Sequence, residues 1–291
     1  MHRKRIYILI SILFAFICFV ELKAQIKLSL LKLSSVTLLD DVVNETSGLI
    51  YFDNSFWTIN DSGGANILYR IDPSNGKVTQ QITINNAENK DWEELTADDK
   101  YVYIADIGDN NHKREEKQIY KIAKVDISIN KKDRVMASEI IRFKYPRFDG
   151  SFNFNAEAMV SDGKVLHLFT KDLLESNHFT IPSKAGNYTA TYIEKLETTG
   201  QVTGAALDSK SKTLIMVGYF GFGDRLLWKL TNFADTHYFK GKVQKFSLGS
   251  LTETSQVEAV CFDKNRKTYF SSESFGNVKQ TLWLLARDIL K

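Results

Sequence analysis

The chain of 291 residues is 43% hydrophobic and carries 38 Lys and Arg residues against 35 Asp and Glu residues. Four of the basic residues and one of the acidic residues lie within residues 1–24, so residues 25–291 are formally neutral. The neutral part lacks the broad basic field that attracts nucleic acid or anionic lipid, which excludes function classes that depend on such a field.

The first 24 residues have the pattern of a secretory signal. Three basic residues at positions 3–5 precede an apolar run over residues 6–20, and Ala24 offers a small side chain for cleavage. The run is shorter than the roughly 20 residues that a helix needs to span a bilayer. We therefore expect an exported protein (periplasmic, on the outer surface or secreted) that has no membrane span once residues 1–24 are removed. An uncleaved membrane anchor is the alternative.

After the signal pattern, a short segment that begins with a polar residue recurs five times along the chain. Its third residue is Ser, Thr or Glu, its fourth is small in four of the five copies, and an apolar run follows. Successive copies begin 46, 64, 46 and 55 residues apart, which matches the length of one four-stranded blade of a β-propeller. The five copies are residues 45–49, 91–95, 155–159, 201–205 and 256–260.

Further strands are predicted after each copy, because β-branched and aromatic residues alternate with polar ones and turns such as Asn75-Gly76 separate the runs. Second strands are expected at residues 56–59, 101–105, 165–169, 213–217 and 268–270. Third strands are expected at residues 68–71, 119–122, 178–181, 227–230 and 282–285. Fourth strands are clearest at residues 77–84, 140–143 and 242–246. A β-sandwich would explain the strands but not the signatures that recur in order.

The last unit predicts how the ring closes. It supplies three strands before Lys291, whereas residues 31–38 form a strand without a partner near the other end of the chain. Placing that strand on the outside of the last blade closes the ring and removes an exposed edge. We therefore expect an all-β fold, a single five-bladed β-propeller domain over residues 25–291, as a monomer. Six blades is the alternative, because the long unit over residues 91–154 has room for further strands.

The cysteine content limits the ways in which the fold can be stabilised. Cys261 is the only cysteine in residues 25–291, which excludes an intramolecular disulfide. Its apolar neighbours Val260 and Phe262 predict a buried thiol. Stability must therefore come from packing, and a chain of this length can bury one large core.

Propeller geometry gathers polar residues at one end of the central channel. The first strand of each blade lines the channel, and its start lies at the same face as the end of the second strand. The ligand-binding mouth predicted in this way comprises Asn60, Asp61, Asp91, Asp109, Asn110, Lys171, Tyr219 and Glu273. Carboxylates outnumber cations there, and crowded carboxylates raise each other's pKa or bind a cation. Their oxygen atoms suit Ca²⁺, whereas no cluster of His and Cys indicates zinc. In the alternative interpretation these acids cap turns or pair with Lys and Arg.

Three residues are candidates for a general base in the same region. They are Glu93, Asp106 and His112. His112 is the one histidine expected near the mouth, and the others are interpreted as structural because no two share the spacing of metal ligands.

The segments 45–49, 57–63, 91–94 and 104–110 resemble a family of secreted bacterial β-propeller proteins. More distantly, the chain is similar to the calcium-dependent propellers, namely the phytase-like esterases and the gluconolactonase and paraoxonase group. The resemblance implies a Ca²⁺ ion low in the channel, held by Glu, Asp and Asn side chains of first strands. The residues of matching type are Glu45, Asn155, Glu157 and Glu258. Those families mostly have six blades, and this chain lacks their clear phosphate-binding set of Lys and Arg around the mouth.

These features favour a binding module: an exported propeller whose acidic mouth, with or without Ca²⁺, takes a small molecule, a glycan or an envelope protein. The alternative is a metal-assisted hydrolase of an ester or lactone, in which the ion polarises the carbonyl and one of the candidate bases activates water. A scaffold that only holds other envelope proteins is a third hypothesis. Fold analogy alone does not choose among them.

Overall fold

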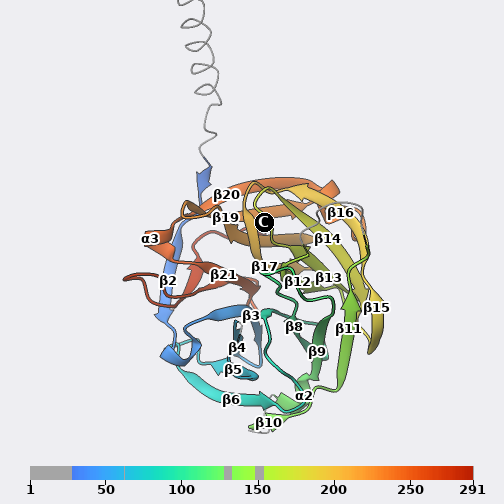
Figure 1. The fold of residues 1–291 in the computed structure, drawn as a ribbon. Helices are drawn as coiled ribbons and strands as arrows, with labels where there is room; N and C mark the ends of the chain where they lie inside the picture. Colours follow the sequence, from blue (N-terminus) through green and yellow to red (C-terminus); the bar gives the residue numbers. More distant parts are fainter. Residues whose placement is uncertain (1–27, 62, 128–132, 148–153, 291) are drawn as a thin grey trace, which may run out of the picture.

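The computed structural model describes residues 28–61, 63–127, 133–147 and 154–290. Five β-sheets surround one axis (Figure 1), which confirms the predicted all-β, five-bladed propeller. The signal predicted for residues 1–24 lies outside the described residues. Within the described residues, no helix is both long and apolar enough to cross a membrane.

Five strands form the inner ring, and each is the first strand of its blade. They are β3 (Thr46–Phe52), β7 (Trp92–Ala97), β12 (Ala156–Ser161), β17 (Gln201–Asp208) and β21 (Val257–Phe262). Each contacts the next around the ring, and β21 contacts β3. These are the five repeat starts that the sequence predicted, because the polar first residue of each repeat directly precedes or begins a strand whose next residues are buried.

The other strands of each blade follow outward in chain order, as the alternating patterns predicted, except for the fourth strand of the last blade. The second strands are β4 (Ser55–Asn60), β8 (Tyr101–Asp106), β13 (Val165–Thr170), β18 (Thr213–Tyr219) and β22 (Thr268–Ser272). The third strands are β5 (Ile67–Ile71), β9 (Lys117–Ala123), β14 (Glu175–Pro182), β19 (Asp224–Thr231) and β23 (Thr281–Leu285). The fourth strands are β6 (Val78–Ile84), β11 (Glu139–Lys144), β16 (Thr191–Glu197), β20 (Lys242–Ser250) and β2 (Leu33–Leu38).

The ring closes through β2, the strand nearest the start of the described chain among the fourth strands. It pairs antiparallel with β23, with Ser34 opposite Leu284 and Leu38 opposite Thr281. The last blade is thereby completed by residues from the opposite end of the chain, as the sequence predicted. The added strand covers the outer edge of β23 and ties the two ends of the domain together.

Three short strands decide between five and six blades. They are β1 (Ser29–Leu30), β10 (Arg134–Val135) and β15 (Gly186–Thr189). Each pairs in parallel with the outer strand of a blade, namely β20, β6 and β11 respectively. Of the three, β10 belongs to the long second unit, and it extends the edge of the first blade. The described residues of that unit therefore build no sixth blade. Short helical segments complete the described chain: η1 (Asp41–Val43), α2 (Lys124–Ile127), η2 (Tyr238–Lys240) and α3 (Leu251–Thr254).

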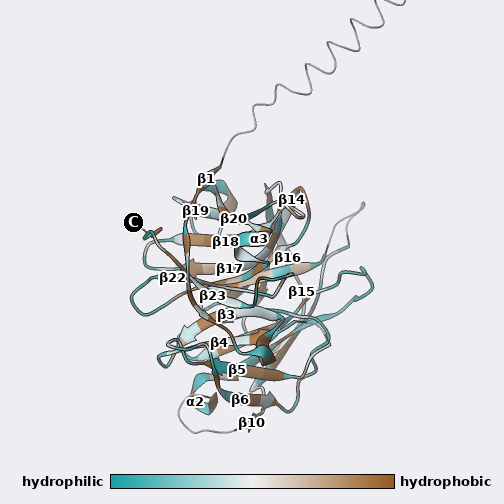
Figure 2. Cartoon of the chain, turned by 90° about the vertical axis from the view of Figure 1, so that its left-hand side faces the viewer, coloured by the Kyte–Doolittle hydropathy of each residue, from teal (hydrophilic) through white to brown (hydrophobic). Residues whose placement is uncertain are grey.

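The core lies between the blades. Trp57 of the first blade and Trp92 of the second are fully buried in one apolar cluster, which joins the two sheets. Cys261 is buried in another cluster with Phe56, so the predicted buried thiol is confirmed. Figure 2 shows hydrophobic residues concentrated in the strands and hydrophilic residues in the connecting loops. Burial of this kind supplies the stability that disulfides do not.

Every inner strand carries a β-bulge at its second or third residue, which is the third residue of the repeat in four blades and the fourth in the first blade. The pairing with the second strand omits one residue in each blade: Gly48, Glu93, Glu157, Thr203 and Glu258. A bulge bends its strand and re-aims a side chain, and bulges are common beside functional sites. Three of the five blades therefore place a glutamate at a bulge beside the channel mouth.

Candidate cation site at the channel mouth

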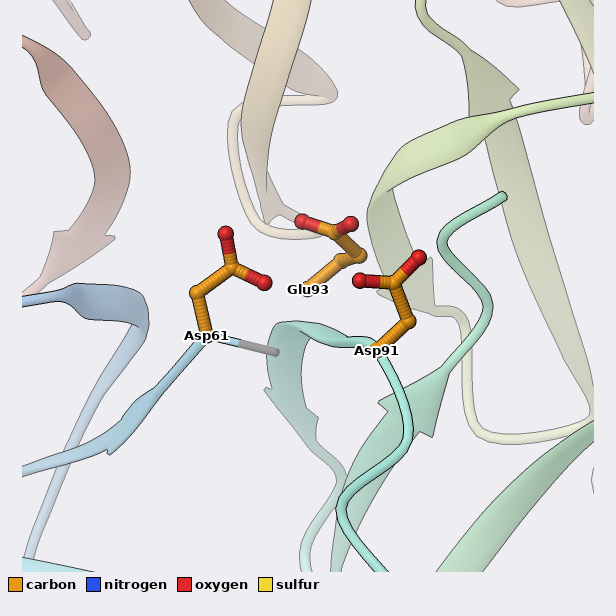
Figure 3. Close-up of side chains that lie close together, drawn as sticks. All are labelled: Asp61, Asp91 and Glu93. Carbon is orange, nitrogen blue, oxygen red and sulfur yellow. The ribbon is translucent and has the colours of Figure 1, made fainter. Parts of the chain in front are cut away.

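Three carboxylates from two blades meet at the mouth. Asp61 follows β4, while Asp91 and Glu93 lie at the start of β7. Their nearest carboxylate oxygens all lie within 4.8 Å of one another, and among the described residues this is the one such group of three His, Cys, Asp or Glu residues. Figure 3 shows the three carboxylates pointing toward one another. The geometry therefore concentrates negative charge on one point between the first and second blades.

Asn89 fixes the position of Asp61 relative to β7. Its side-chain amide donates to the carbonyls of Asn60 and Asp61, both at 3.0 Å. Its Oδ1 accepts from the backbone N–H of Trp92 at 3.1 Å. One buried amide thus joins the exit of β4 to the start of β7, which brings the two aspartates together.

The backbone of Gly108 borders the site on the side of the second blade. Its N–H donates to the carbonyl of Asp91 at 3.2 Å. A Cβ at this position would lie 2.1 Å from Glu93 Oε1 and 2.5 Å from Asp91 Oδ2. The backbone therefore passes so close to both carboxylates that even a methyl group at this position would force them to move.

Glu93 is the most deeply buried of the three carboxylates. Its side chain is only 3% exposed, and Oε1 has no hydrogen-bond partner. Burial raises the pKa of Glu93 well above its usual range, the charges of Glu157, Asp61 and Asp91 raise it further, and Lys171 offsets part of the effect. An orphaned buried carboxylate oxygen costs free energy unless a proton or a cation reaches it.

The opposite side of the mouth contains a cation of the chain itself. Lys171, at the exit of β13, places its Nζ 2.6 Å from Glu157 Oε1 and 2.5 Å from Oε2. Burial alone would lower the pKa of Lys171, but the carboxylates of Glu157 and Glu258 outweigh it and raise the pKa. Burial raises the pKa of Glu157 to about 7, against the pull of Lys171. Lys171 therefore neutralises this side of the mouth.

Tyr219 and Arg225 extend the Lys171 side of the mouth outward. The Tyr219 ring lies 5.5 Å from Lys171 Nζ, and the Arg225 guanidinium lies 4.8 Å from the same ring. Arg225 also donates at 2.8 Å to the carbonyls of Gly221 and Gly223. The loop after β18 is thereby fixed beside the mouth.

Glu258 and Glu273 face each other across the amide of Gln256. The amide donates at 3.3 Å to both Glu258 Oε1 and Glu273 Oε2. Burial raises the pKa of Glu258. Burial, with the charges of Glu258, Asp61 and Glu45, raises the pKa of Glu273 to about 9. With a pKa of about 9 and no bound cation, Glu273 holds a proton at neutral pH.

Two predicted site residues in the loop after β8 are paired by basic neighbours. Asp106 is fully buried and accepts from Arg114 at 2.8 Å. Asp109 accepts from Lys117 at 2.6 Å. These pairs fold the loop over residues 107–116 into a fixed shape, which carries Gly108 against the acidic cluster.

His112, the histidine predicted near the mouth, lies on the outer part of the same loop. It is exposed, adopts a left-handed backbone conformation with φ of 54°, and lines a surface pocket with Tyr145, Arg147 and Phe154. The acidic cluster of Asp61, Asp91 and Glu93 does not contribute to the lining of that pocket.

The set implied by the resemblance as metal ligands is divided among several contacts. The Glu45 carbonyl accepts from the N–H of Asp61 at 2.9 Å. Asn155 accepts from the N–H of Asp109 at 2.6 Å and donates to Asn110 Oδ1 at 3.0 Å. Glu157 is paired with Lys171. The metal-binding role of that set stays a prediction, and the geometry brings together Asp61, Asp91 and Glu93.

The structure contains a buried histidine pair that the sequence did not predict. His167 Nδ1 and His178 Nε2 lie 2.9 Å apart, and His178 Nδ1 lies 3.4 Å from Glu194 Oε1. Burial lowers the pKa of both rings, that of His167 to about 4. The two residues are on adjacent strands β13 and β14, and only the register of that hairpin brings them together.

Comparison with known proteins shows the fold. No family model and no curated protein matches the sequence. Glutaminyl cyclase from Myxococcus xanthus is similar in structure at 6% identity, over 89% of this chain and 97% of that one, with a TM-score of 0.55. The PQQ-bound aldose sugar dehydrogenase from Streptomyces coelicolor matches at 11% identity over 87% and 97%, with a TM-score of 0.49. The calcium-binding protein regucalcin from Agrobacterium tumefaciens matches at 9% identity over 89% and 95%, with a TM-score of 0.47. The likeness to glutaminyl cyclase shows the fold alone, and none of these likenesses carries an activity over to this chain.

Proposed function

We propose that the chain is an exported β-propeller binding module that holds a Ca²⁺ ion at Asp61, Asp91 and Glu93 and presents it to a small ligand or glycan. The observation that carries the proposal is the orphaned Oε1 of Glu93, on a side chain 97% buried and pointing at two further carboxylates. A carboxylate oxygen in that position is stabilised by a cation.

The spacing and chemistry of the three side chains favour Ca²⁺. Oxygens bound to one Ca²⁺ at roughly 2.3–2.6 Å lie at most about 5 Å apart, which accommodates ligand atoms within 4.8 Å of one another. The group contains oxygen donors and no His or Cys, which disfavours zinc. Ca²⁺ takes about 6–8 oxygens, so three carboxylates leave positions for water and for oxygens of a bound ligand.

Charge balance in the mouth supports the same proposal. Seven carboxylates interact there, and Lys171 pairs directly with Glu157. The seven are Glu45, Asp61, Asp91, Glu93, Glu157, Glu258 and Glu273. Protons or a divalent cation must relieve this repulsion, and a bound ion would displace the protons.

A metal-assisted hydrolase of an ester or lactone is the second candidate. Glu157, with a pKa near 7, has the proton affinity that suits acid–base catalysis at neutral pH. A panel of ester and lactone substrates, assayed with Ca²⁺ and with chelator, separates this candidate from a binding module.

The test of the cation site is a melting curve with Ca²⁺ and with chelator. Ca²⁺ at about 100 times its Kd stabilises the folded state by about 2.7 kcal/mol, which raises Tm by roughly 5–10 °C for a domain of this size. Glu93→Gln is expected to abolish the shift. Glu116→Gln, on an exposed acid of the loop after β8, is the matched control and should leave the shift intact. A wild-type Tm that is identical in Ca²⁺ and chelator contradicts the proposal.

Export is tested separately. N-terminal sequencing of the protein recovered from its cellular compartment should begin at Gln25 if the predicted signal is removed. An intact N-terminus in the cytoplasm would overturn this part of the proposal.

A further inference from the structure

Glu94, the neighbour of Glu93, occupies a position where the other blades have no long side chain. It is the fourth residue of its repeat and is fully buried. The equivalent residues of the other blades are Gly48, Ala158, Gly204 and Ala259. Because four of the five inner strands carry Gly or Ala there, the ring has room for one long side chain, and β7 supplies it.

The Glu94 carboxylate crosses the ring and is bonded by backbone N–H groups of several blades. Oε1 accepts from the N–H of Leu95 in β7 at 2.9 Å, and Oε2 accepts from the N–H of Ala205 in β17 at 2.9 Å. The backbone N–H groups of Leu49 in β3 and Met159 in β12 also act on it and lower its pKa. Four of the five inner strands therefore direct a donor to one carboxylate.

The chemistry of this contact is that of an anion site. Burial raises the pKa of Glu94 well above its usual range, and the four backbone N–H groups act in the opposite direction. All four partners are donors, so a protonated carboxyl would have no acceptor among them for its O–H group. Converging backbone N–H groups form concave sites for anions in proteins generally.

The contact is coupled to the mouth through the bulge of β7. Glu93 and Glu94 are consecutive at that bulge, so fixing one fixes the direction of the other. Neighbouring strand β3 packs tightly on the same point: Ser47 Oγ donates to the Glu93 carbonyl at 2.5 Å, and a Cβ on Gly48 would lie 2.3 Å from Leu95 N.

We propose that the inner strands build an axial anion-binding site from backbone N–H groups, that the Glu94 carboxylate is its tethered occupant, and that this occupancy positions Glu93 in the mouth. Small monocarboxylates are the ligand class that the site takes when the tether is removed. The positioning part rests on the proposed cation site, whereas the anion site stands independently of it.

The variant Glu94→Ala keeps Cβ and lacks Cγ and the carboxylate. Acetate can replace these atoms, because its methyl carbon corresponds to Cγ and its carboxylate to that of Glu94. We expect Glu94→Ala to lower Tm by roughly 5–15 °C in chloride buffer. Refolding in sodium acetate should restore several degrees of Tm, in a saturable manner, relative to sodium chloride of equal ionic strength. Wild type and Glu93→Gln are controls, and neither should respond to acetate beyond its general salt effect.

Glu94→Gln provides a variant that fills the site without a carboxylate. The amide N–H₂ group of the glutamine would face the backbone N–H donors, so Tm should fall. Acetate should have no effect on this variant, because the glutamine side chain already fills the site. If Glu94→Ala does not fold in chloride, the yield of folded protein in acetate is the measurement. A Tm for Glu94→Gln equal to wild type, or equal behaviour of Glu94→Ala in acetate and chloride, overturns the anion site.

The positioning role needs a measurement that loss of stability alone would not change. Ca²⁺ affinity measured by calorimetry well below Tm should fall about 10-fold in Glu94→Ala and return toward wild type with acetate. Unchanged Ca²⁺ affinity would refute positioning and leave the anion site standing. Should the wild type bind no Ca²⁺, the proposed function fails, and the acetate experiment still decides the anion site.

Discussion

The two sides of the mouth place a glutamate at the same point of a repeat and neutralise it in different ways. In the third blade, Glu157 meets Lys171, the residue that follows the second strand. In the second blade the residue in that place is Ile107, which is buried in the core, and Glu93 meets Asp61 and Asp91 instead. The residue after the second strand therefore decides whether the bulge glutamate is paired within the chain. Where it is not, the buried carboxylate needs a proton or a cation from solution.

The largest expected effect comes from removing the internal cation. Lys171→Met leaves Glu157 buried without its partner, and breaking a buried ion pair costs about 3–5 kcal/mol. Urea unfolding at pH 7 in chelator measures the loss. With Lys171 absent, the two sides of the mouth become alike, so calorimetry should detect a second equivalent of bound Ca²⁺.

The double variant Lys171→Met with Glu157→Gln is the control for that experiment. It removes both charges together, so most of the stability should return and the additional Ca²⁺ equivalent should disappear. A single Ca²⁺ equivalent in Lys171→Met would show that the two sides are not interchangeable.

The second prediction concerns pH. The folded-state pKa values of Glu157 and Glu273 are raised to about 7 and about 9, above their unfolded values. The folded state therefore holds protons that the unfolded state releases. The stability that these groups contribute is fully present below about pH 4.5 and is lost as pH rises through 7 and 9. In chelator, Tm should fall by several degrees between pH 6 and pH 9.

Calcium should reverse part of this alkaline loss. The ion competes with protons for the same carboxylates, so Ca²⁺ affinity rises over the pH range in which stability without the ion falls. The Tm difference between Ca²⁺ and chelator should therefore widen from pH 6 to pH 9. A difference that stays constant with pH would separate the cation site from the protonated glutamates.

The smallest expected effect comes from a single methyl group. Gly108→Ala places a Cβ against Glu93 and Asp91, so the two carboxylates must move apart. Ca²⁺ affinity should fall about 10-fold, or about 1.4 kcal/mol, with little change in Ca²⁺ affinity for Gly64→Ala. The latter is the matched control, since its Cβ would lie 3.4 Å from its nearest neighbour, the Asp61 carbonyl.

The sequence alone predicted the elements that repeat. Alternation of apolar and polar residues located the strands. The five recurring starts predicted five blades, with six as the alternative, and the mouth to which Asp61, Asp91 and Glu93 belong. These features follow from local periodicity and from the geometry of a closed ring, which every blade obeys in the same way. The closing strand followed from counting the strands of the last unit.

Only the tertiary structure decided which side chains meet. The pairing of Glu157 with Lys171, and the close passage of Gly108 beside Glu93, depend on the bulges and on the paths of the loops. The bond from Ala205 to Glu94 joins residues 111 apart in the sequence and two blades apart in the ring. Local patterns specify strands because each strand has its own periodicity. The contact at the axis depends on where the backbones of four blades meet one side chain, and no local pattern contains that information.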